Sequence, residues 1–193
     1  MPLVFLFNSL FAIAPLPNSH LIEYYPIDKE CHTEGEILDY LDDIPIYNNG
    51  KMQNTFGRHL SEDGYNFGLK WQCVEFVKRY YYFHFDHKMP NTYGHAKDFF
   101  DKNLGTGWNA HRCLFQQSNS SLNLPKKGSI LVFAPTKNNP FGHVGIVSKV
   151  NKKYVEVAQQ NWGNKTRMIV PLKNVDGRYI IGNASILGWL FIK

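Results

Sequence analysis

The stretch KWQCVEFVKRYYYF, Lys70 to Phe83, marks the point where the sequence changes character. A glycine-punctuated segment ends near Gly68, and from Gln72 to about Phe85 apolar residues recur at steps of three and four. This spacing predicts an amphipathic helix with Cys73 in its first turn. A helix N-terminus favours a thiolate, because its unpaired N–H groups and its dipole stabilise negative charge. Cys73 is therefore a candidate nucleophile, and a small buried apolar residue is the alternative interpretation.

The segments around this helix are predicted from their turn residues and periodicity. A short helix is expected around Gly35 to Leu41, and Ile46 to Gly57 is expected to be a loop because Asn and Gly suit turns. A second helix is expected over Asn91 to Asn103, followed by a loop from Gly105 to Asn123.

The last third of the chain differs, because short β-branched or aromatic runs alternate there with turn residues. These runs predict strands of an antiparallel sheet. Helices first and strands after indicate an α+β domain, with N-terminal helices packed on a C-terminal antiparallel sheet. The runs are SILVFA, HVGIVSKV, YVEVAQQN, RMIVPL and ILGWLFIK.

Length and composition predict one globular domain. The 193 residues carry 21 basic and 16 acidic side chains, a net charge of +5 without a block of like charges. An apolar run from Leu3 to Pro15, with Ala12-Ile13-Ala14 before the proline, is typical of a signal peptide. We expect a signal peptide at 1–14, a single domain at 15–193 and a periplasmic or secreted protein. A buried element or an uncleaved membrane anchor is the alternative for the leader, and the cytoplasm is the alternative location.

The chain contains three cysteines, Cys31, Cys73 and Cys113. In an oxidising compartment an odd count leaves one thiol free. If Cys73 stays free for chemistry, Cys31 and Cys113 are the candidate disulfide by elimination. The sequence has no Cys-x-x-C and no zinc-like His/Cys spacing, so neither a metal nor a cofactor is expected.

A base for Cys73 is sought among the eight histidines, and His143 stands out. It opens the run HVGIVSKV after the turn NNPFG, so its ring is expected at the sheet edge where Cys73 could approach. A Cys/His pair needs a third group to orient the imidazole. Period-2 alternation puts Gln159 and Asn161 on one face of the next strand, so we expect Gln159 to orient His143 and Asn161 to assist. Glu156, on the other face, is the alternative.

These residues resemble a known family. The order of Cys in WQCVEF, His in GHVGIV and a later Q-x-N is similar to the CHAP superfamily of cysteine, histidine-dependent amidohydrolases and peptidases. GLKWQCVEFVKRYY, IPIYNNG and AQQNW resemble most closely the amidase domain of glutathionylspermidine synthetase/amidase. The resemblance implies a papain-like fold with Cys73 as nucleophile and His143 as general base.

The sequence departs from the family pattern at Gln159, where the resemblance would place a glutamate. A glutamine carbonyl can accept the Nδ1–H of His143, but it adds no negative charge to stabilise an imidazolium. We therefore expect a less populated ion pair. The oxyanion is expected to be held by the backbone N–H of Cys73 with help from Gln72.

Two substrates fit this thiol chemistry: an amide bond in peptidoglycan peptide, and the glutathione-polyamine amide of glutathionylspermidine. The rival function is a catalytically impaired module that binds peptide or cell-wall fragments, motivated by Gln159. No nucleic-acid partner and no stable membrane insertion are expected.

Overall fold

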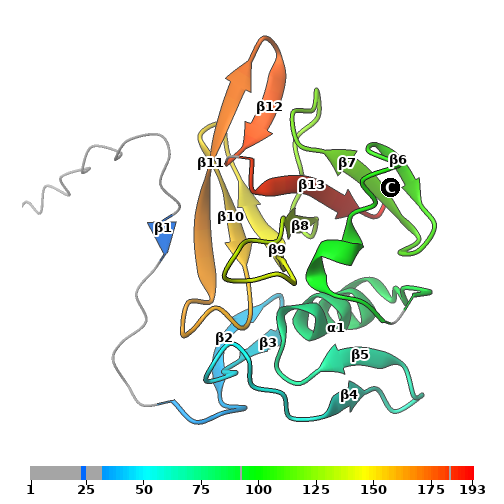
Figure 1. Ribbon diagram of the computed structural model, residues 1–193, viewed down its shortest axis with the longest axis vertical. Helices are drawn as coiled ribbons and strands as arrows, with labels where there is room; N and C mark the ends of the chain where they lie inside the picture. Colours follow the sequence, from blue (N-terminus) through cyan, green and yellow to red (C-terminus); the bar gives the residue numbers. More distant parts are fainter. Residues whose placement is uncertain (1–22, 25–31, 92, 183) are drawn as a thin grey trace, which may run out of the picture.

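One α-helix lies at the centre of the fold, between a large sheet and two small hairpins (Figure 1). The computed structural model describes residues 23–24, 32–91, 93–182 and 184–193. The predicted signal peptide at 1–14 lies outside these residues. The helix, α1 (Cys73–Phe85), matches the helix predicted from the apolar spacing.

The large sheet has nine strands, all paired antiparallel, so the sheet expected from the C-terminal runs is present. The strand order is β1-β11-β10-β9-β8-β13-β7-β6, and β12 pairs with β11. In Figure 1 the β11–β12 hairpin projects from the end of the sheet away from α1. The strands are β1 (Glu23–Tyr24), β6 (Gly107–Asn109), β7 (Leu114–Ser118), β8 (Ile130–Phe133), β9 (His143–Val150), β10 (Tyr154–Ala158), β11 (Arg167–Val175), β12 (Arg178–Ile181) and β13 (Ile186–Phe191).

Strand β8 shows how the sheet separates two cores. Its four residues are all buried, and successive side chains point to opposite faces. Ile130 and Val132 belong to the cluster around α1, whereas Leu131 and Phe133 belong to a second cluster that includes the buried Trp189. The sheet is therefore covered on both faces at its centre, which explains the continuous apolar run of this strand.

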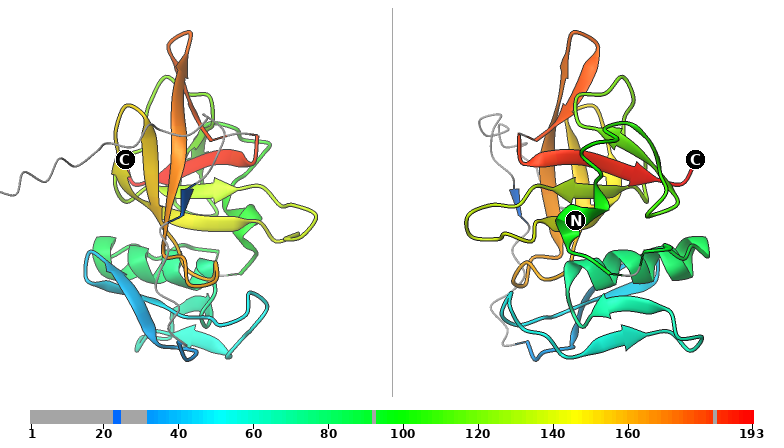
Figure 2. Two further views of the ribbon diagram at one scale, coloured as in Figure 1. Left: turned by 90° about the vertical axis from the view of Figure 1, so that its left-hand side faces the viewer. Right: turned by 45° about the vertical axis from the view of Figure 1, so that its right-hand side comes forward.

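Two small hairpins cover the side of α1 that faces away from the large sheet (Figure 2). They are β2 (Ile37–Leu41) with β3 (Ile44–Tyr47), and β4 (Arg58–Leu60) with β5 (Asn66–Leu69). Because α1 is covered on two sides, its polar residues Glu75, Lys78 and Arg79 are buried together with its apolar ones. The helix therefore buries polar side chains as well as the apolar face that its sequence indicates.

The helix expected around Gly35 to Leu41 is wrong, because the segment forms strand β2. Asp42 and Asp43 follow it with positive φ values of 47° and 65°. Two successive residues in this conformation make the tight turn that joins β2 to β3, a turn whose twist suits a two-residue hairpin. The expectation of several N-terminal helices is therefore corrected to one α-helix and two hairpins in the described part of the chain.

The helix expected over Asn91 to Asn103 is also wrong. The described residues there contain only a short 3-10 helix, η1 (Ala96–Phe99), in which the Asp98 carboxylate accepts the His95 N–H at 2.7 Å. The loop expected from Gly105 to Asn123 contains β6 and β7. The sequence of β7 does not show the usual alternation of apolar and polar residues, because Gln116 is polar although its side chain is buried.

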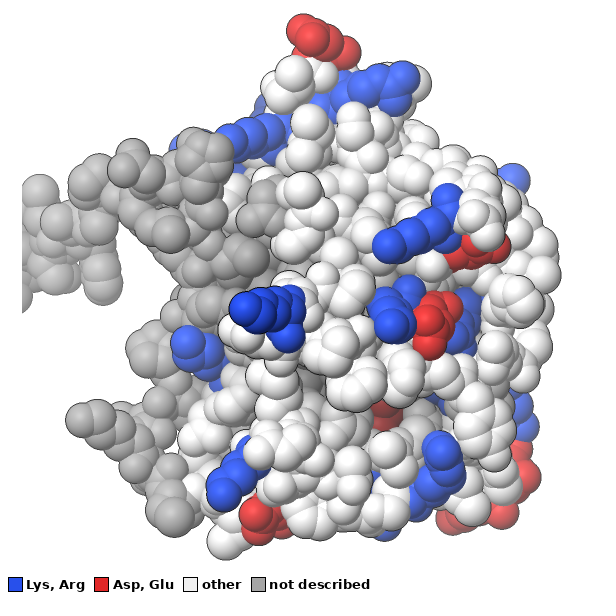
Figure 3. Space-filling model, in the orientation of Figure 1, with Lys and Arg blue, Asp and Glu red and all other residues white. Residues whose placement is uncertain are grey.

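Lys and Arg side chains are scattered over the face in Figure 3, with acidic side chains among them. This distribution agrees with the absence of a block of like charges from the sequence. None of the described helices is both long and apolar enough to cross a membrane.

Candidate active site

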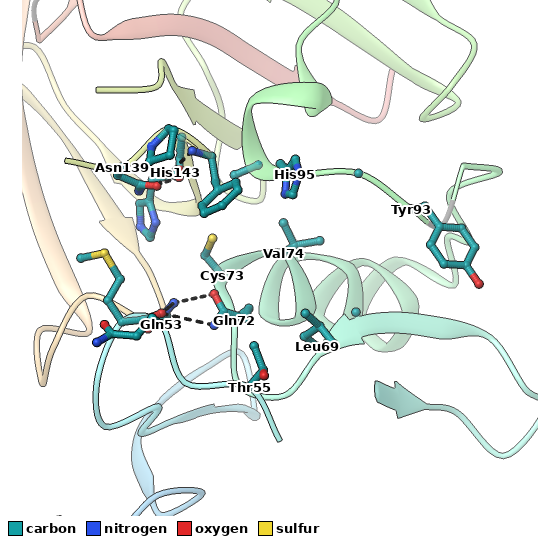
Figure 4. Close-up of a pocket in the computed structure, with 18 of the residues that line it drawn as sticks. Gln53, Thr55, Leu69, Gln72, Cys73, Val74, Tyr93, His95, Asn139 and His143 are labelled. Atoms are coloured by element: carbon teal, nitrogen blue, oxygen red, sulfur yellow. Dashed lines mark hydrogen bonds between the residues drawn. The ribbon is translucent and has the colours of Figure 1, made fainter. Parts of the chain in front are cut away.

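A cavity of about 590 Å³ lies above the start of α1 and contains both Cys73 and His143 among its lining residues. Figure 4 shows Cys73 rising from the start of α1 toward the end of the cavity where His143 lies. Leu69 and Val74 lie farther along the cavity, and Tyr93 marks its other end. The structure therefore brings the predicted nucleophile and the predicted base to the same end of one cavity.

Cys73 is buried at the first position of α1, with 8% of its surface exposed. Burial raises the pKa of its thiol to about 11, although hydrogen bonds from the backbone N–H groups of Val144, Val74 and Cys73 itself act to lower it. Desolvation therefore outweighs the helix N-terminus. The resting thiol is protonated at neutral pH.

His143 is held by Gln159 through Nε2, not through the Nδ1 expected from the sequence. The distance from His143 Nε2 to Gln159 Oε1 is 3.0 Å, and Gln159 Nε2 donates to the Lys165 carbonyl at 3.1 Å. Because the second bond fixes the orientation of the amide, the Gln159 oxygen faces the imidazole and Nε2 must carry the hydrogen. The Nδ1 of neutral His143 is then free to accept a proton.

The surroundings of His143 favour the neutral imidazole. Burial lowers the pKa of His143 to about 4, and the hydrogen bond to Gln159 opposes this shift only in part. The ring lies between Phe133 and Trp162, with centroid distances of 5.6 and 4.9 Å. With a protonated thiol and a neutral imidazole, the resting pair carries no net charge on either member.

The residue after Gln159 connects the sheet to the start of the helix. Gln160 Nε2 donates to the Gln72 carbonyl at 3.1 Å and to Glu75 Oε2 at 2.7 Å. Its Oε1 accepts the Tyr47 N–H of β3 at 2.8 Å. Gln160 is fully buried and therefore ties three elements together beside Cys73. No motif or periodicity in the sequence indicated this role of Gln160.

Asn161 holds Gln72 in the structure, and no hydrogen bond joins it to His143. Its Nδ2 donates to Gln72 Oε1 at 2.6 Å and to the Met52 carbonyl at 3.0 Å, while its Oδ1 accepts from Asn49 Nδ2 at 2.8 Å. The backbone of Asn161 has a φ of 63°, a conformation that Asn tolerates better than most residues. Asn161 thus fixes Gln72, the residue before Cys73.

The side chain of Gln72 is directed away from a reacting carbonyl. Both of its amide hydrogens have acceptors, the Asn54 carbonyl at 2.6 Å and the Met52 carbonyl at 3.3 Å. The first N–H groups of a helix have no partner within the helix. The backbone N–H groups of Cys73 and Val74, which also act on the Cys73 thiol, are the donors at this position that could face an oxyanion.

Glu75, in the first turn of α1, is fully buried and surrounded by polar partners. His59 Nδ1 lies 2.7 Å and Arg79 Nε 2.6 Å from its Oε1, and Gln160 donates to its other oxygen. Burial acts to raise the pKa of Glu75, but His59, Arg79 and Gln160 outweigh it, so the carboxylate stays ionised. The spacing of Glu75 and Arg79 by four residues is the sequence signal that could have indicated this pair.

The structure does not bring the alternative residue Glu156 to His143. A register shift follows Glu156 in the pairing of β10 with β9, yet its carboxylate accepts the Ser148 hydroxyl at 2.8 Å and lies 3.8 Å from Arg167 Nη1. Gly145 allows the close approach of the two strands, since a Cβ there would lie 2.5 Å from Val157 Cγ1.

Two further expectations concern cysteines and metals. Cys113 is a free thiol among the described residues, and Cys31 lies outside them, so the Cys31–Cys113 disulfide stays a prediction. Within residues 32–91, 93–182 and 184–193, no three His, Cys, Asp or Glu side chains come together as a metal site.

The amino-acid sequence is similar to those of known proteins. The chain is 32% identical over 121 residues to Endolysin LysK of Staphylococcus phage K, covering 62% of this chain and 22% of that protein. It is 33% identical over 138 residues to Glutathionylspermidine synthase of Crithidia fasciculata, covering 65% of this chain and 19% of that protein. The chain is 27% identical over 130 residues to Trypanothione synthetase of the same organism, covering 66% of this chain and 20% of that protein. The chain thus spans about a fifth of the length of each relative.

The family model described as CHAP domain matches residues 64–161, which contain Cys73, His143, Gln159 and Asn161. This match covers more than half of the 193 residues. The chain belongs to the CHAP domain family.

Proposed function

We propose that this protein is a thiol-dependent amidase or peptidase that cleaves an amide bond through an acyl-thioester on Cys73. The observation that carries the proposal is that Cys73, at the N-terminus of α1, and His143, held by Gln159, line the same end of one cavity. Family membership supports hydrolysis of an amide, because CHAP stands for cysteine, histidine-dependent amidohydrolases and peptidases. The roles of the individual residues are part of the proposal.

The first half of the reaction transfers one proton and forms one bond. The Nδ1 of His143 takes the proton of the Cys73 thiol as Sγ attacks the amide carbonyl carbon. The oxyanion is stabilised by the backbone N–H groups of Cys73 and Val74. The His143 imidazolium then gives its proton to the amide nitrogen, the C–N bond breaks, and the amine leaves an acyl-thioester.

The second half restores the enzyme. Neutral His143 takes a proton from a water molecule, whose oxygen attacks the thioester carbonyl. The C–S bond breaks, the sulfur recovers the proton from the imidazolium, and a carboxylic acid is released. Gln159 keeps Nε2 protonated throughout, so the same imidazole nitrogen acts in both halves.

A peptide amide in peptidoglycan is the substrate that we favour. The similarity to an endolysin supports it. The cavity supports it as well, since no Asp or Glu is among the described residues that line it. A polyamine carries several positive charges, and an amide whose leaving group is a polyamine would find no carboxylate among these residues to pair with them.

A glutathione-polyamine amide is the second candidate, supported by the 33% identity to Glutathionylspermidine synthase. A catalytically impaired CHAP module that binds peptide or wall fragments is the candidate from another class. It is motivated by the neutral Gln159 and by the pKa values of Cys73 and His143, which disfavour the thiolate–imidazolium pair.

The experiment that decides among these is mass spectrometry of products from muropeptides and from glutathionylspermidine, incubated side by side with the protein. The proposal predicts new amine and acid products from muropeptides, lost in Cys73→Ala. Products from glutathionylspermidine alone would select the second substrate. Products from neither, with muropeptide binding retained, would favour the impaired module.

A further inference from the structure

The end of the cavity opposite His143 carries a positive charge that the proposed chemistry does not use. Arg58, at the start of β4, lines the cavity with Tyr93, and both side chains are exposed. The guanidinium carbon of Arg58 lies 4.9 Å from the centroid of the Tyr93 ring. Such stacking restricts the guanidinium to one plane while its N–H groups stay available.

The charges around Arg58 are complementary to an anion. Arg58 forms no ion pair with any described residue, and none of the described residues that line the cavity is acidic. Lys78 and Arg112 are buried cations, and the charge of Arg58 acts on Lys78. The carboxylate of Asp98 lies outside the lining residues and accepts the His95 N–H.

The pKa values of Lys78 and Arg112 are both lowered. Burial, followed by the charges of Arg112 and Arg58, lowers the pKa of Lys78 to about 7. Burial also lowers the pKa of Arg112 to about 10. The carboxylate of Asp98 opposes the shift of the Arg112 pKa. A negative group bound at Arg58 would offset the repulsion that Arg58 exerts on Lys78, because an opposite charge nearby favours the protonated form.

We propose that Arg58, stacked on Tyr93, binds a carboxylate of the substrate and so selects acidic peptides. This inference rests on the proposed amidase function and names the substrate class for the same cavity. A guanidinium can donate two parallel hydrogen bonds to one carboxylate, which fixes the orientation of the bound group. Figure 4 shows Tyr93 at the far end from His143, with Val74 and Leu69 between them. The bound carboxylate and the cleaved amide are therefore separate positions of one substrate.

The first test measures binding without catalysis. Cys73→Ala protein is titrated with a peptidoglycan stem peptide as the free acid, and with the same peptide whose carboxylates are converted to primary amides. We expect the free acid to bind more tightly, and Arg58→Gln in the Cys73→Ala background to weaken its binding by about 10- to 100-fold. Binding of the amide form should be unchanged by Arg58→Gln.

A matched control removes the same charge nearby. Lys51 is exposed, neighbours the cavity residue Met52 and does not line the cavity itself. Lys51→Gln should change binding of the free acid by less than threefold, and Arg58→Lys should retain part of the preference. Equal weakening of both peptides by Arg58→Gln, or no effect on either, overturns the proposal.

The second test uses the active protein and separates failure of this inference from failure of the proposed function. With Cys73 present, Arg58→Gln should lower kcat/KM for the free acid by about the same factor and leave the amide form unaffected. If the active protein cleaves both peptides equally well, the carboxylate site is wrong and the amidase function stands. If it cleaves neither peptide, the amidase function fails for this substrate, and the binding comparison still decides the role of Arg58.

Discussion

The two ends of the cavity differ in how they are built. At one end, Cys73 and His143 are buried and neutral, and the amides of Gln159, Gln160 and Asn161 bind β9, α1 and the N-cap of α1. At the other end, Arg58 and Tyr93 are exposed and held mainly by contact with each other. At the first end, here called the reactive end, buried hydrogen bonds fix the positions of the side chains. The second end, here called the exposed end, offers an accessible positive charge.

This difference predicts which property a substitution at each end should change. In a low-dielectric site a lost hydrogen-bond partner leaves a buried group unsatisfied, which costs more than the loss of a surface contact. Changes at the reactive end should therefore abolish rate or destabilise the fold. Changes at the exposed end should alter only the choice of substrate.

The largest effect is expected for His143→Ala. Without a base for the Cys73 thiol, whose pKa is raised to about 11, kcat/KM should fall by about three orders of magnitude or more. Steady-state cleavage of muropeptides measures this, with thermal unfolding as a check that the variant is folded. A folded variant that keeps more than a tenth of the rate would contradict the assignment of the base.

Glu75→Ala should destabilise the protein more than any other single change at this end. The variant leaves Arg79 buried without its carboxylate and removes one of the two acceptors of Gln160, and breaking a buried ion pair in this way costs about 3–5 kcal/mol. Urea denaturation measures the loss in free energy of unfolding. The exposed Glu62, changed to Gln, is the matched control, with an expected change within about 0.5 kcal/mol. A loss as small as that of the control would show that Glu75 has no structural role.

Gln159→Glu should change the pH dependence of the reaction. His143 must be neutral to act as base, so kcat/KM of the parent should fall only as pH decreases toward about 4. A carboxylate at 159 favours the imidazolium and raises the pKa of His143, so the acidic limb should move to higher pH. We also expect the rate at neutral pH to rise, although a carboxylate cannot donate to the Lys165 carbonyl as Gln159 does.

Gln159→Ala serves as the comparison for this prediction, because it removes the hydrogen bond without adding charge. Its acidic limb should not move to higher pH, and its rate should fall. Identical pH profiles for Gln159→Glu and the parent would show that residue 159 does not act on His143.

The smallest effect is expected from salt. Because Arg58 is exposed, its attraction for a carboxylate is screened as the Debye length shortens from about 10 Å at 0.1 M to about 3 Å at 1 M salt. Cleavage of an acidic peptide should slow by about threefold over this range, through KM. The Arg58→Gln variant should lose this dependence. An equal salt effect in both proteins would assign it to other charges.

The sequence predicted best the elements with a strong periodicity. The spacing of Cys73, Phe76, Val77 and Tyr80 predicted α1 because this face packs on the sheet, and the β-branched runs predicted the central strands. The hairpin β2–β3 was missed because its turn depends on the backbone conformation of two aspartates, which a pattern of apolar residues does not report.

The part of the site that depends on the alternation of a single strand was predictable from the sequence. Alternation along the strand put Gln159 on the face opposite to Glu156, and the structure has Gln159 at 3.0 Å from His143 and Glu156 beside Ser148. The roles of Gln160 and Asn161 could not be predicted, because their partners Tyr47 and Asn49 lie more than 100 residues away in the sequence. The raised pKa of Cys73 was missed for a related reason: burial by distant segments outweighs the local effect of the helix N-terminus.

The central claim, that Cys73 carries the acyl group, is tested most directly by trapping the intermediate. The protein is mixed with excess muropeptide substrate, quenched in acid within milliseconds to seconds, and analysed by intact mass and peptide mapping. We predict a mass increase equal to the acyl fragment on the peptide that contains Cys73, absent in Cys73→Ala and strongly reduced in His143→Ala. An acyl group on another residue, or amide cleavage that persists in Cys73→Ala, would contradict the account.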